Sequence, residues 1–173
     1  DRGFYYAALD QVLGGGRRLT FDLGTWPDGR PYAAPVTLAE DPPPPQPDLH
    51  VRRADQTAWA GVGVVDPSGT GQVRSARVAA GRAASFVVRL VDPTGAAAPV
   101  QGTAGGPRFA VRYLDRATGV DRTAEVVAGT LQLPAGGQLR VVVRPRAGLA
   151  AGTGRTVVVG VGADAVRMLT TVR

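Results

Sequence analysis

Several amino acids are missing or rare in this chain of 173 residues, and their absence excludes whole classes of chemistry. There is no cysteine, so neither a disulfide nor a thiolate metal site can form. His50 is the only histidine, which excludes a metal site built from several imidazoles and leaves a serine triad no choice of base. No run of about 18 apolar residues occurs, so the sequence offers no candidate for a membrane-spanning helix.

Lysine, isoleucine and asparagine are also absent, and all 20 basic residues are arginine. These three types have AT-rich codons, whereas the abundant Gly, Ala, Pro, Arg and Val have GC-rich codons. A GC-rich genome therefore explains much of the composition. The 14 acidic residues leave a formal net charge of +6. The chain begins at Asp1 rather than methionine, from which we expect a mature or excised product.

A proline-rich stretch, DPPPPQP, occupies residues 41–47 and divides the chain. Four consecutive prolines favour a stiff polyproline II spacer and disfavour a helix or an inner strand. Six of the ten aromatic residues precede this stretch, so the two flanking regions differ in character. We predict an N-terminal extension over 1–40, a linker over 41–47 and a folded domain over 48–173.

The downstream region is rich in segments that alternate between apolar and other residues. Their apolar faces are Phe86, Val88, Leu90; Phe109, Val111, Tyr113; Leu139, Val141, Val143; and Val157, Val159, Val161. Period-two alternation with β-branched residues indicates strands with one buried face. Further strands are predicted over 49–53, 60–65, 73–79, 124–133 and 166–172, and Trp59 is expected to join the core. The spacing of turns between them predicts an all-β antiparallel sandwich rather than a parallel α/β sheet.

Two segments carry the residues of type I turns, at Asp66–Gly69 (DPSG) and Asp92–Gly95 (DPTG). Aspartate accepts hydrogen bonds from the backbone, proline pre-sets φ, and glycine relieves crowding at the exit. A calcium loop is the sharper alternative, with Asp115 and Asp121 as its best pair. Calcium requires six to eight oxygen ligands, and too few carboxylates cluster here, so we expect no metal site.

The segments that carry a family resemblance are Pro47–Arg53 (PDLHVRR), Val78–Gly95, Phe109–Asp115, Leu133–Pro145 and Ala151–Val159. With them, residues 48–173 resemble the Ig-like or fibronectin-III-like β-sandwich modules of large secreted and cell-surface bacterial proteins. The resemblance implies a spacer, an adhesin stalk or a carbohydrate-contacting repeat. It brings no catalytic residues to carry over.

The N-terminal extension is too short to build its own core, yet it carries apolar side chains. Residues 18–23 alternate as a strand, a turn is expected at 26–29, and residues 31–39 could return as an edge strand. Residues 4–13 suit either a helix or a strand. The extension could pack on its own sandwich, belong to a preceding domain, or add a strand to a neighbouring subunit. In the last case, the assembly contacts would be Leu19, Phe21, Leu23, Trp26 and Tyr32.

Enzymatic functions find little support. None of the three serines lies in a G-x-S-x-G motif, and Glu40 and Glu125 are the only glutamates. We expect His50 to be an exposed residue at the start of a strand rather than a catalytic base. The arginines fall opposite the apolar positions and are spread along the chain. They predict a solvated basic face that meets acidic polysaccharide or a neighbouring subunit's carboxylates, not a nucleic acid.

The sequence therefore predicts a non-catalytic structural subunit or module of a bacterial extracellular filament, surface layer or adhesin. We expect a homo-oligomer or polymer joined through the N-terminal extension, with no cofactor, no nucleic acid and no membrane span. The alternative is a carbohydrate-binding accessory module of a secreted protein. That alternative requires an exposed aromatic platform, for which Trp26, Tyr32 and Trp59 are the candidates.

Overall fold

The structure of the protein, a computed structural model, describes residues 45–173. The predicted donor strand over 18–23 lies outside the described residues. So do the candidate assembly contacts, which are Leu19, Phe21, Leu23, Trp26 and Tyr32.

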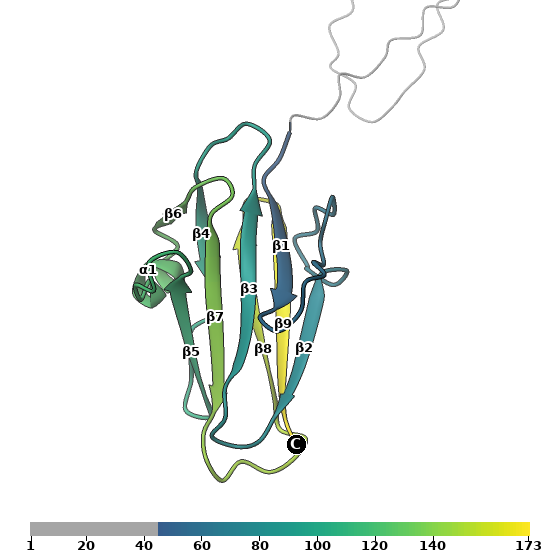
Figure 1. The fold of residues 1–173 in the computed structure, drawn as a ribbon, viewed down its shortest axis with the longest axis vertical. Helices are drawn as coiled ribbons and strands as arrows, with labels where there is room; N and C mark the ends of the chain where they lie inside the picture. The colour runs from purple at the N-terminus through teal and green to yellow at the C-terminus, as the bar shows by residue number, and fades with distance from the viewer. Residues whose placement is uncertain (1–44) are drawn as a thin grey trace, which may run out of the picture. The chain divides into compact units, whose positions relative to one another are not determined.

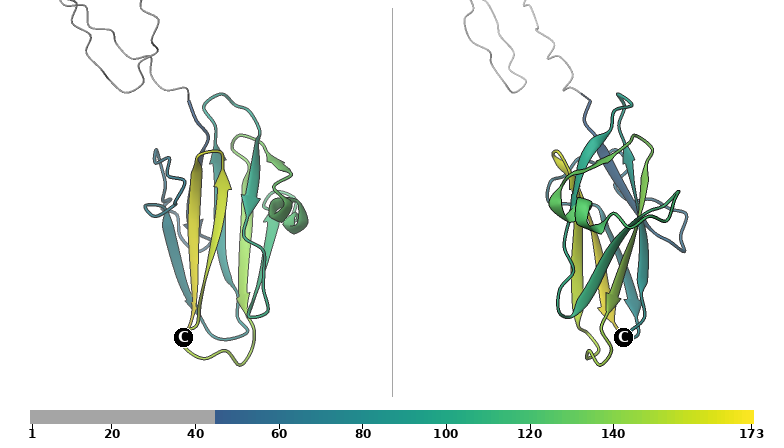
Figure 2. Two further views of the ribbon diagram at one scale, coloured as in Figure 1. Left: turned by 180° about the vertical axis from the view of Figure 1, so that it is seen from behind. Right: turned by 90° about the vertical axis from the view of Figure 1, so that its left-hand side faces the viewer.

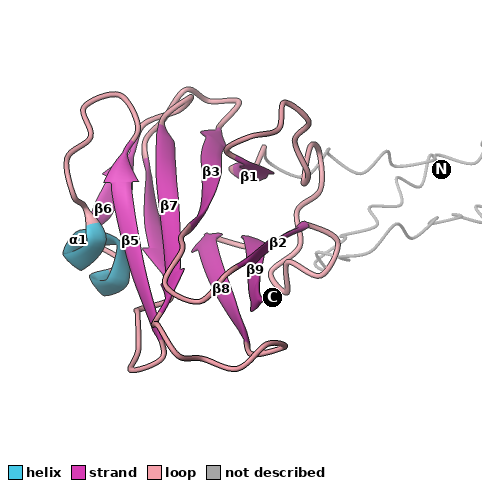
Figure 3. Cartoon of the chain, turned by 60° about the horizontal axis from the view of Figure 1, so that its bottom comes forward, coloured by secondary structure: helices cyan, strands magenta, loops and turns pink. Residues whose placement is uncertain are grey.

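The described residues form two β-sheets packed face to face (Figures 1 and 3). The four-stranded sheet has the order β1 (Asp48–Arg53), β3 (Ala84–Val91), β7 (Gln138–Pro145), β5 (Phe109–Asp115). The five-stranded sheet has the order β2 (Val73–Val78), β9 (Asp164–Val172), β8 (Gly154–Val161), β4 (Ala98–Gly102), β6 (Leu131–Leu133). One short helix, α1 (Thr123–Ala128), follows β5. The predicted all-β sandwich is therefore confirmed.

The core between the sheets comes from the alternation seen in the sequence. The predicted core residues of β3, β5 and β7 are at most 5% exposed. They pack against Val157 and Val159 of β8 and against Met168 of β9, which are fully buried. Burying each large side chain contributes about 1.5–3 kcal/mol. This core is built by residues 49–172.

One strand pairing differs from the antiparallel sandwich expected from the sequence. Strand β2 lies at the end of the five-stranded sheet and pairs with β9 in parallel, from Val73 opposite Arg167 to Val78 opposite Val172. The view from behind shows the two strands side by side (Figure 2). A parallel pair requires a crossover connection, and here nearly the whole domain separates the two strands along the chain. The five-stranded sheet is therefore mixed.

The prediction of a strand over 124–133 was right only for its last three residues and wrong for the rest. The segment forms α1, ends it at Gly129, and only then enters the short strand β6. The Asp121 carboxylate accepts a hydrogen bond from the Thr123 amide at 3.0 Å as the helix begins. Gly129 adopts a left-handed φ of 72°, which ends the helix. Val126 is fully buried, so the apolar Val-Val pair provides a helix-to-core contact rather than a strand face.

The prediction of a strand over 60–65 was also wrong. Only Ala60 pairs, with Val51 of β1, through amide-to-carbonyl distances of 2.9 and 2.8 Å. Gly61 and Gly63 then take φ values of +89° and +69°, which an extended strand cannot accommodate. Strand β4 was not predicted. Within residues 45–173, no helix is both long enough and apolar enough to cross a membrane.

Candidate functional site

The aspartates in the turns accept hydrogen bonds from residues of the same turn. In both predicted turns, the glycine amide donates to the aspartate carbonyl, at 2.9 Å for Asp66 and 3.1 Å for Asp92. Hydrogen bonds from Ser68 lower the pKa of Asp66 below its usual value. The Asp115 carboxylate likewise accepts the Thr118 amide at 2.9 Å, which lowers its pKa. The part of the chain that the structure describes contains no cluster of three or more metal-ligating side chains.

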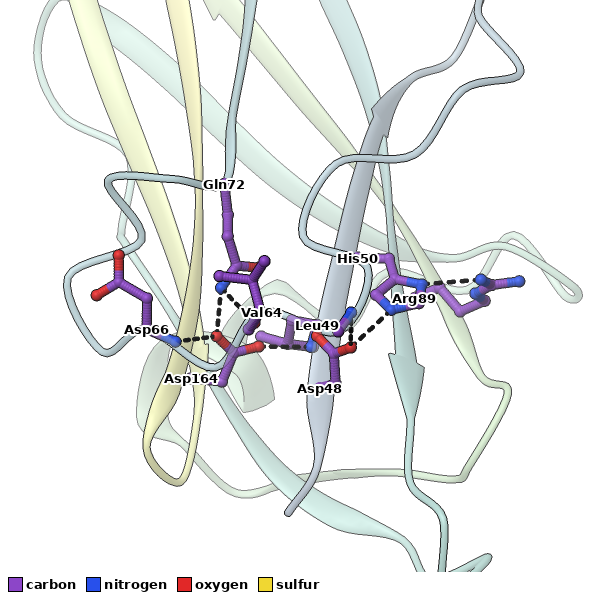
Figure 4. Close-up of polar contacts among 9 residues, drawn as sticks. Asp48, Leu49, His50, Val64, Asp66, Gln72, Arg89 and Asp164 are labelled. Carbon is purple, nitrogen blue, oxygen red and sulfur yellow. Dashed lines mark hydrogen bonds and ion pairs between the residues drawn. The ribbon is translucent and has the colours of Figure 1, made fainter. Parts of the chain in front are cut away.

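A buried carboxylate joins the two sheets at the start of β9 (Figure 4). Asp164 is only 2% exposed and accepts three hydrogen bonds. The Leu49 amide of β1 donates at 2.6 Å, the Asp66 amide at 3.0 Å and the Gln72 side-chain amide at 2.5 Å. The same Gln72 amide group donates to the Val64 carbonyl at 2.8 Å. Asp164 thus holds the segment between β1 and β2, and its acceptor atoms are used for structure.

His50 is buried, contrary to the prediction of an exposed residue, with 4% of its surface accessible. Its Nδ1 lies 2.8 Å from an Arg89 guanidinium nitrogen, and its Nε2 lies 2.9 Å from the Asp48 carboxylate (Figure 4). Arginine can only donate, so Nδ1 accepts and Nε2 carries the proton that is donated to Asp48. Both ring nitrogens are engaged, which leaves neither of them free to act on a substrate.

Trp59 does not enter the core, contrary to prediction. Its ring is half-buried, with the guanidinium carbon of Arg89 4.5 Å and that of Arg52 5.0 Å from the ring centroid. The His50 ring lies 6.3 Å away, tilted by 55°. Cation–π contacts of this kind fix the orientation of arginine side chains. Trp59 therefore positions two arginines.

The outer face of the four-stranded sheet is rich in arginine, and we call it the basic face. Its arginines are Arg52 of β1, Arg89 of β3, Arg140 and Arg144 of β7, Arg112 of β5 and Arg116 just after β5. Each strand position opposite a core residue points to this side, as the sequence predicted. The strand order then gathers these side chains on one surface, which sequence alternation alone does not reveal. The alternating pattern thus shows which way each arginine points, but it does not show the order of the strands.

The register places the arginines of the basic face in rows across the sheet. Arg52 lies opposite Val87, and Val87 lies opposite Arg140. Arg140 is in turn opposite Leu114 of β5. A cavity of about 330 Å³ opens here, with Val87 and Leu114 as apolar lining and Arg116, Arg140 and one acid, Asp115, as charged lining. The row thus combines apolar surface with cationic groups.

Few of these arginines are neutralised by neighbouring acids. Arg112 pairs with Asp121 at 2.8 Å. The other five have no ion-pair partner among residues 45–173. The guanidinium groups of Arg116 and Arg140 contact neutral oxygens instead, those of Gln138 at 2.6 Å and Ser85 at 3.3 Å. The basic face therefore presents unneutralised, partly oriented cations.

A larger cavity, of about 640 Å³, opens on the other sheet beside β4, β8 and β9. Among the described residues, its lining is mainly glycine, alanine and proline, and Asp164 is the one ionisable residue there. Because the Asp164 oxygens already accept three hydrogen bonds, the described lining of this cavity offers no free charged group to a ligand.

Strand β2 has an unpaired edge within the described sheets. On its other edge, the Arg167 amide donates to the Gln72 carbonyl and the Arg173 amide to the Val78 carbonyl, both at 2.9 Å. Alternate residues of a strand direct their backbone groups to opposite edges, so the amides and carbonyls of Val73, Ser75 and Arg77 point away from β9. All three residues are exposed. We call this row the open edge.

A groove of about 610 Å³ runs beside the open edge. It is lined by Arg53 and residues 55–58 from the segment after β1, and by Val73, Arg74 and Ser75 of β2. The side chain of Arg74 donates to the Val73 carbonyl at 3.3 Å. The open edge is therefore bordered by a groove of the described surface.

No protein-family model matches this chain, and no curated protein matches it. Among solved structures, it is similar to domains 4 and 5 of the S-layer protein SbsC, with 20% sequence identity and a TM-score of 0.35. The match covers 57% of this chain and 46% of that one, so it spans less than half the length of that structure. A likeness at this level carries no argument about function.

Proposed function

We propose that this chain is a non-catalytic structural module of a bacterial extracellular filament, surface layer or adhesin, whose copies join by strand addition at the open edge. The observation that carries the proposal is the unpaired row of backbone groups at Val73, Ser75 and Arg77. An accessible edge strand is a template for pairing with another chain. Strand addition supplies affinity through main-chain hydrogen bonds and specificity through alternate side chains.

The donor in this proposal is residues 18–23 of a second copy. Their sequence, RLTFDL, alternates the apolar Leu19, Phe21 and Leu23 with polar residues, as an added strand requires. The acidic Asp22 would approach an edge that carries Arg74 and Arg77. Addition from one copy to the next is a heterologous contact, which generates a filament when it does not close into a ring.

The proposed role as a scaffold agrees with how the described polar side chains are used. Both nitrogens of His50 and both oxygens of Asp164 are engaged in internal hydrogen bonds. The alternative, a module that stacks sugars on aromatic rings, has little support in residues 45–173. Trp59 is the one aromatic residue there that is not buried, and two arginines contact its ring.

The test replaces one backbone donor of the open edge in the full chain. Ser75→Pro removes an amide that points away from β9, so the sandwich should still fold, because edge strands tolerate proline on their solvent side. Ser75→Ala is the matched control, since it changes the side chain and keeps the amide. Light scattering after size-exclusion chromatography and negative-stain microscopy report assembly, and circular dichroism reports folding.

We expect the wild type and Ser75→Ala to form concentration-dependent oligomers or fibres and folded Ser75→Pro to remain monomeric. Assembly of Ser75→Pro at the wild-type level would overturn the open edge as the joint. A wild-type chain that stays monomeric at every concentration would overturn addition between copies.

A further inference from the structure

We propose that the basic face binds an acidic polysaccharide, whose carboxylate or sulfate groups are held by arginines of this face. The inference does not rest on the assembly proposed above, because the basic face belongs to the four-stranded sheet and the open edge to the five-stranded sheet. Its centre is the cavity between Arg116 and Arg140.

Charge is the first argument for this partner. Residues 45–173 hold sixteen arginines and eight acidic residues, which gives them a formal net charge of +8. Six of those arginines lie on the basic face, and five of the six have no carboxylate partner within this part of the chain. Arg112, Arg140 and Arg144 are also exposed. A guanidinium group pairs with a carboxylate or sulfate through two parallel hydrogen bonds.

Spacing is the second argument. Strands of a sheet lie about 4.8 Å apart, so Arg52 and Arg140, which are separated by Val87, have their backbones about 10 Å apart. Arg140 and Arg144 are four residues apart on β7, or about 14 Å. Cations at such intervals on a sheet suit a polymer that repeats its acidic groups along an extended chain. An isolated small anion would need only one of them.

The cavity explains why the partner should be a sugar polymer rather than a bare polyanion. Leu114 is partly exposed and lines it with apolar surface, which can receive the carbon face of a sugar ring. Arg116 and Arg140 border that surface and can receive the acidic group of the same or the next sugar. Contacts to Gln138 and Ser85 orient these two side chains in advance and reduce the entropy lost on binding.

Nucleic acids fit this surface less well. Proteins that bind single strands stack the bases on aromatic side chains. Within residues 45–173, the one aromatic residue beside the basic face is Trp59, and its ring is already contacted by Arg52 and Arg89. Base readout in a duplex needs a helix or ribbon that enters a groove, and the basic face is the side of a broad sheet (Figure 3).

The experiment measures binding of the full chain to polygalacturonate, which carries carboxylates, and to heparin, which carries sulfates as well. Neutral dextran and single- and double-stranded DNA are the comparison polymers. The test variant is the double substitution Arg116→Gln and Arg140→Gln. The matched control removes the same charge from the other sheet, away from the open edge, through Arg167→Gln in β9 and Arg173→Gln just after it. Circular dichroism and the assembly state of each variant are compared with the wild type.

We expect the wild type to bind one or both acidic polysaccharides with an affinity that falls as salt rises, and not to bind dextran. The test variant should lose at least about tenfold in affinity, whereas the control should lose no more than about threefold. Equal losses in both variants would show a general charge effect and overturn the site. Tighter binding to DNA than to either polysaccharide would overturn the partner.

Discussion

Replacing Asp164 with asparagine perturbs the contact that joins β9 to β1 and to the segment before β2. Aspartate presents two acceptor oxygens, which receive the Leu49 amide, the Asp66 amide and the Gln72 side chain. Asparagine presents one oxygen and one NH₂ group of the same size. Either the Leu49 amide or the other two donors must then face a donor, at a site where Asp164 is 2% exposed.

The size of the effect follows from these contacts. A hydrogen bond to a charged group contributes about 1.5–3 kcal/mol, and leaving a buried donor unsatisfied costs about 1–3 kcal/mol. Because one acceptor survives, we expect Asp164→Asn to lower the free energy of unfolding by about 2–4 kcal/mol. That is a large share of the 5–15 kcal/mol typical of a domain.

The assay is equilibrium urea unfolding of the full chain at neutral pH, followed by circular dichroism and Trp fluorescence. Asp92→Asn is the matched control, because Asp92 accepts the Thr94 amide at 2.7 Å in a turn where asparagine serves as well. We expect that control to stay within about 0.5 kcal/mol of the wild type. If Asp164→Asn changed stability no more than the control, the reasoning about this carboxylate would be refuted.

Two further substitutions test the charge on Asp121 and the hydrogen bond made by the buried Tyr113 of β5. Hydrogen bonds from Thr123, and then from Arg112, lower the pKa of Asp121 to about 2, below its unfolded value of about 3.9. The ionised form therefore stabilises the fold above about pH 4, and this contribution is lost as the pH falls towards 2. The stability gap between wild type and Asp121→Asn, at most about 1 kcal/mol for so exposed a pair, should close over that range in acid unfolding curves. A gap that persists at pH 2 would contradict the assignment. Burial raises the pKa of Tyr113 well above its usual value, so ultraviolet titration should show its phenol ionising only when the chain unfolds. Tyr113→Phe should cost about 1 kcal/mol, because it removes the 2.8 Å hydrogen bond to the Thr103 carbonyl; a cost near zero would contradict a structural role for that bond.

The strands whose alternation is strict could be predicted because burial enforces a period of two on a one-sided sheet. Phe86 and Leu139 illustrate this, since each sits on a predicted strand and is fully buried. Strand β4 was missed because Pro99 and Gly102 weaken its pattern, although Val100 is fully buried. The strand propensity of this segment alone did not predict that β4 would pair with other strands.

Segments 60–65 and 124–133 show the opposite error. Each segment contains two consecutive valines, which suggested a strand. In the first segment, the chain is redirected by the positive φ values of Gly61 and Gly63. In the second, it is redirected by the turn at Asp121. Short apolar runs do not distinguish a strand from a helix that buries a single side chain such as Val126.

The candidate surfaces depended on topology more than on motif. Alternation predicted that the arginines would point away from the core, but only the order β1-β3-β7-β5 shows that six of them share one face. The burial of His50 could not be predicted, because Arg89 and Asp48 reach it through strand pairing and a neighbouring position. The open edge follows from the parallel pairing of β2 with β9, for which the sequence has no local signal.

Amide hydrogen exchange along β2 tests strand addition most directly, measured on the full chain when dilute and when concentrated. The amide of Ala76 points to β9 and should be protected in both samples. The amides of Ser75 and Arg77 point to the open edge, so they should exchange quickly in the dilute sample and slowly in the concentrated one. Fast exchange of Ser75 and Arg77 at all concentrations would contradict assembly through this edge.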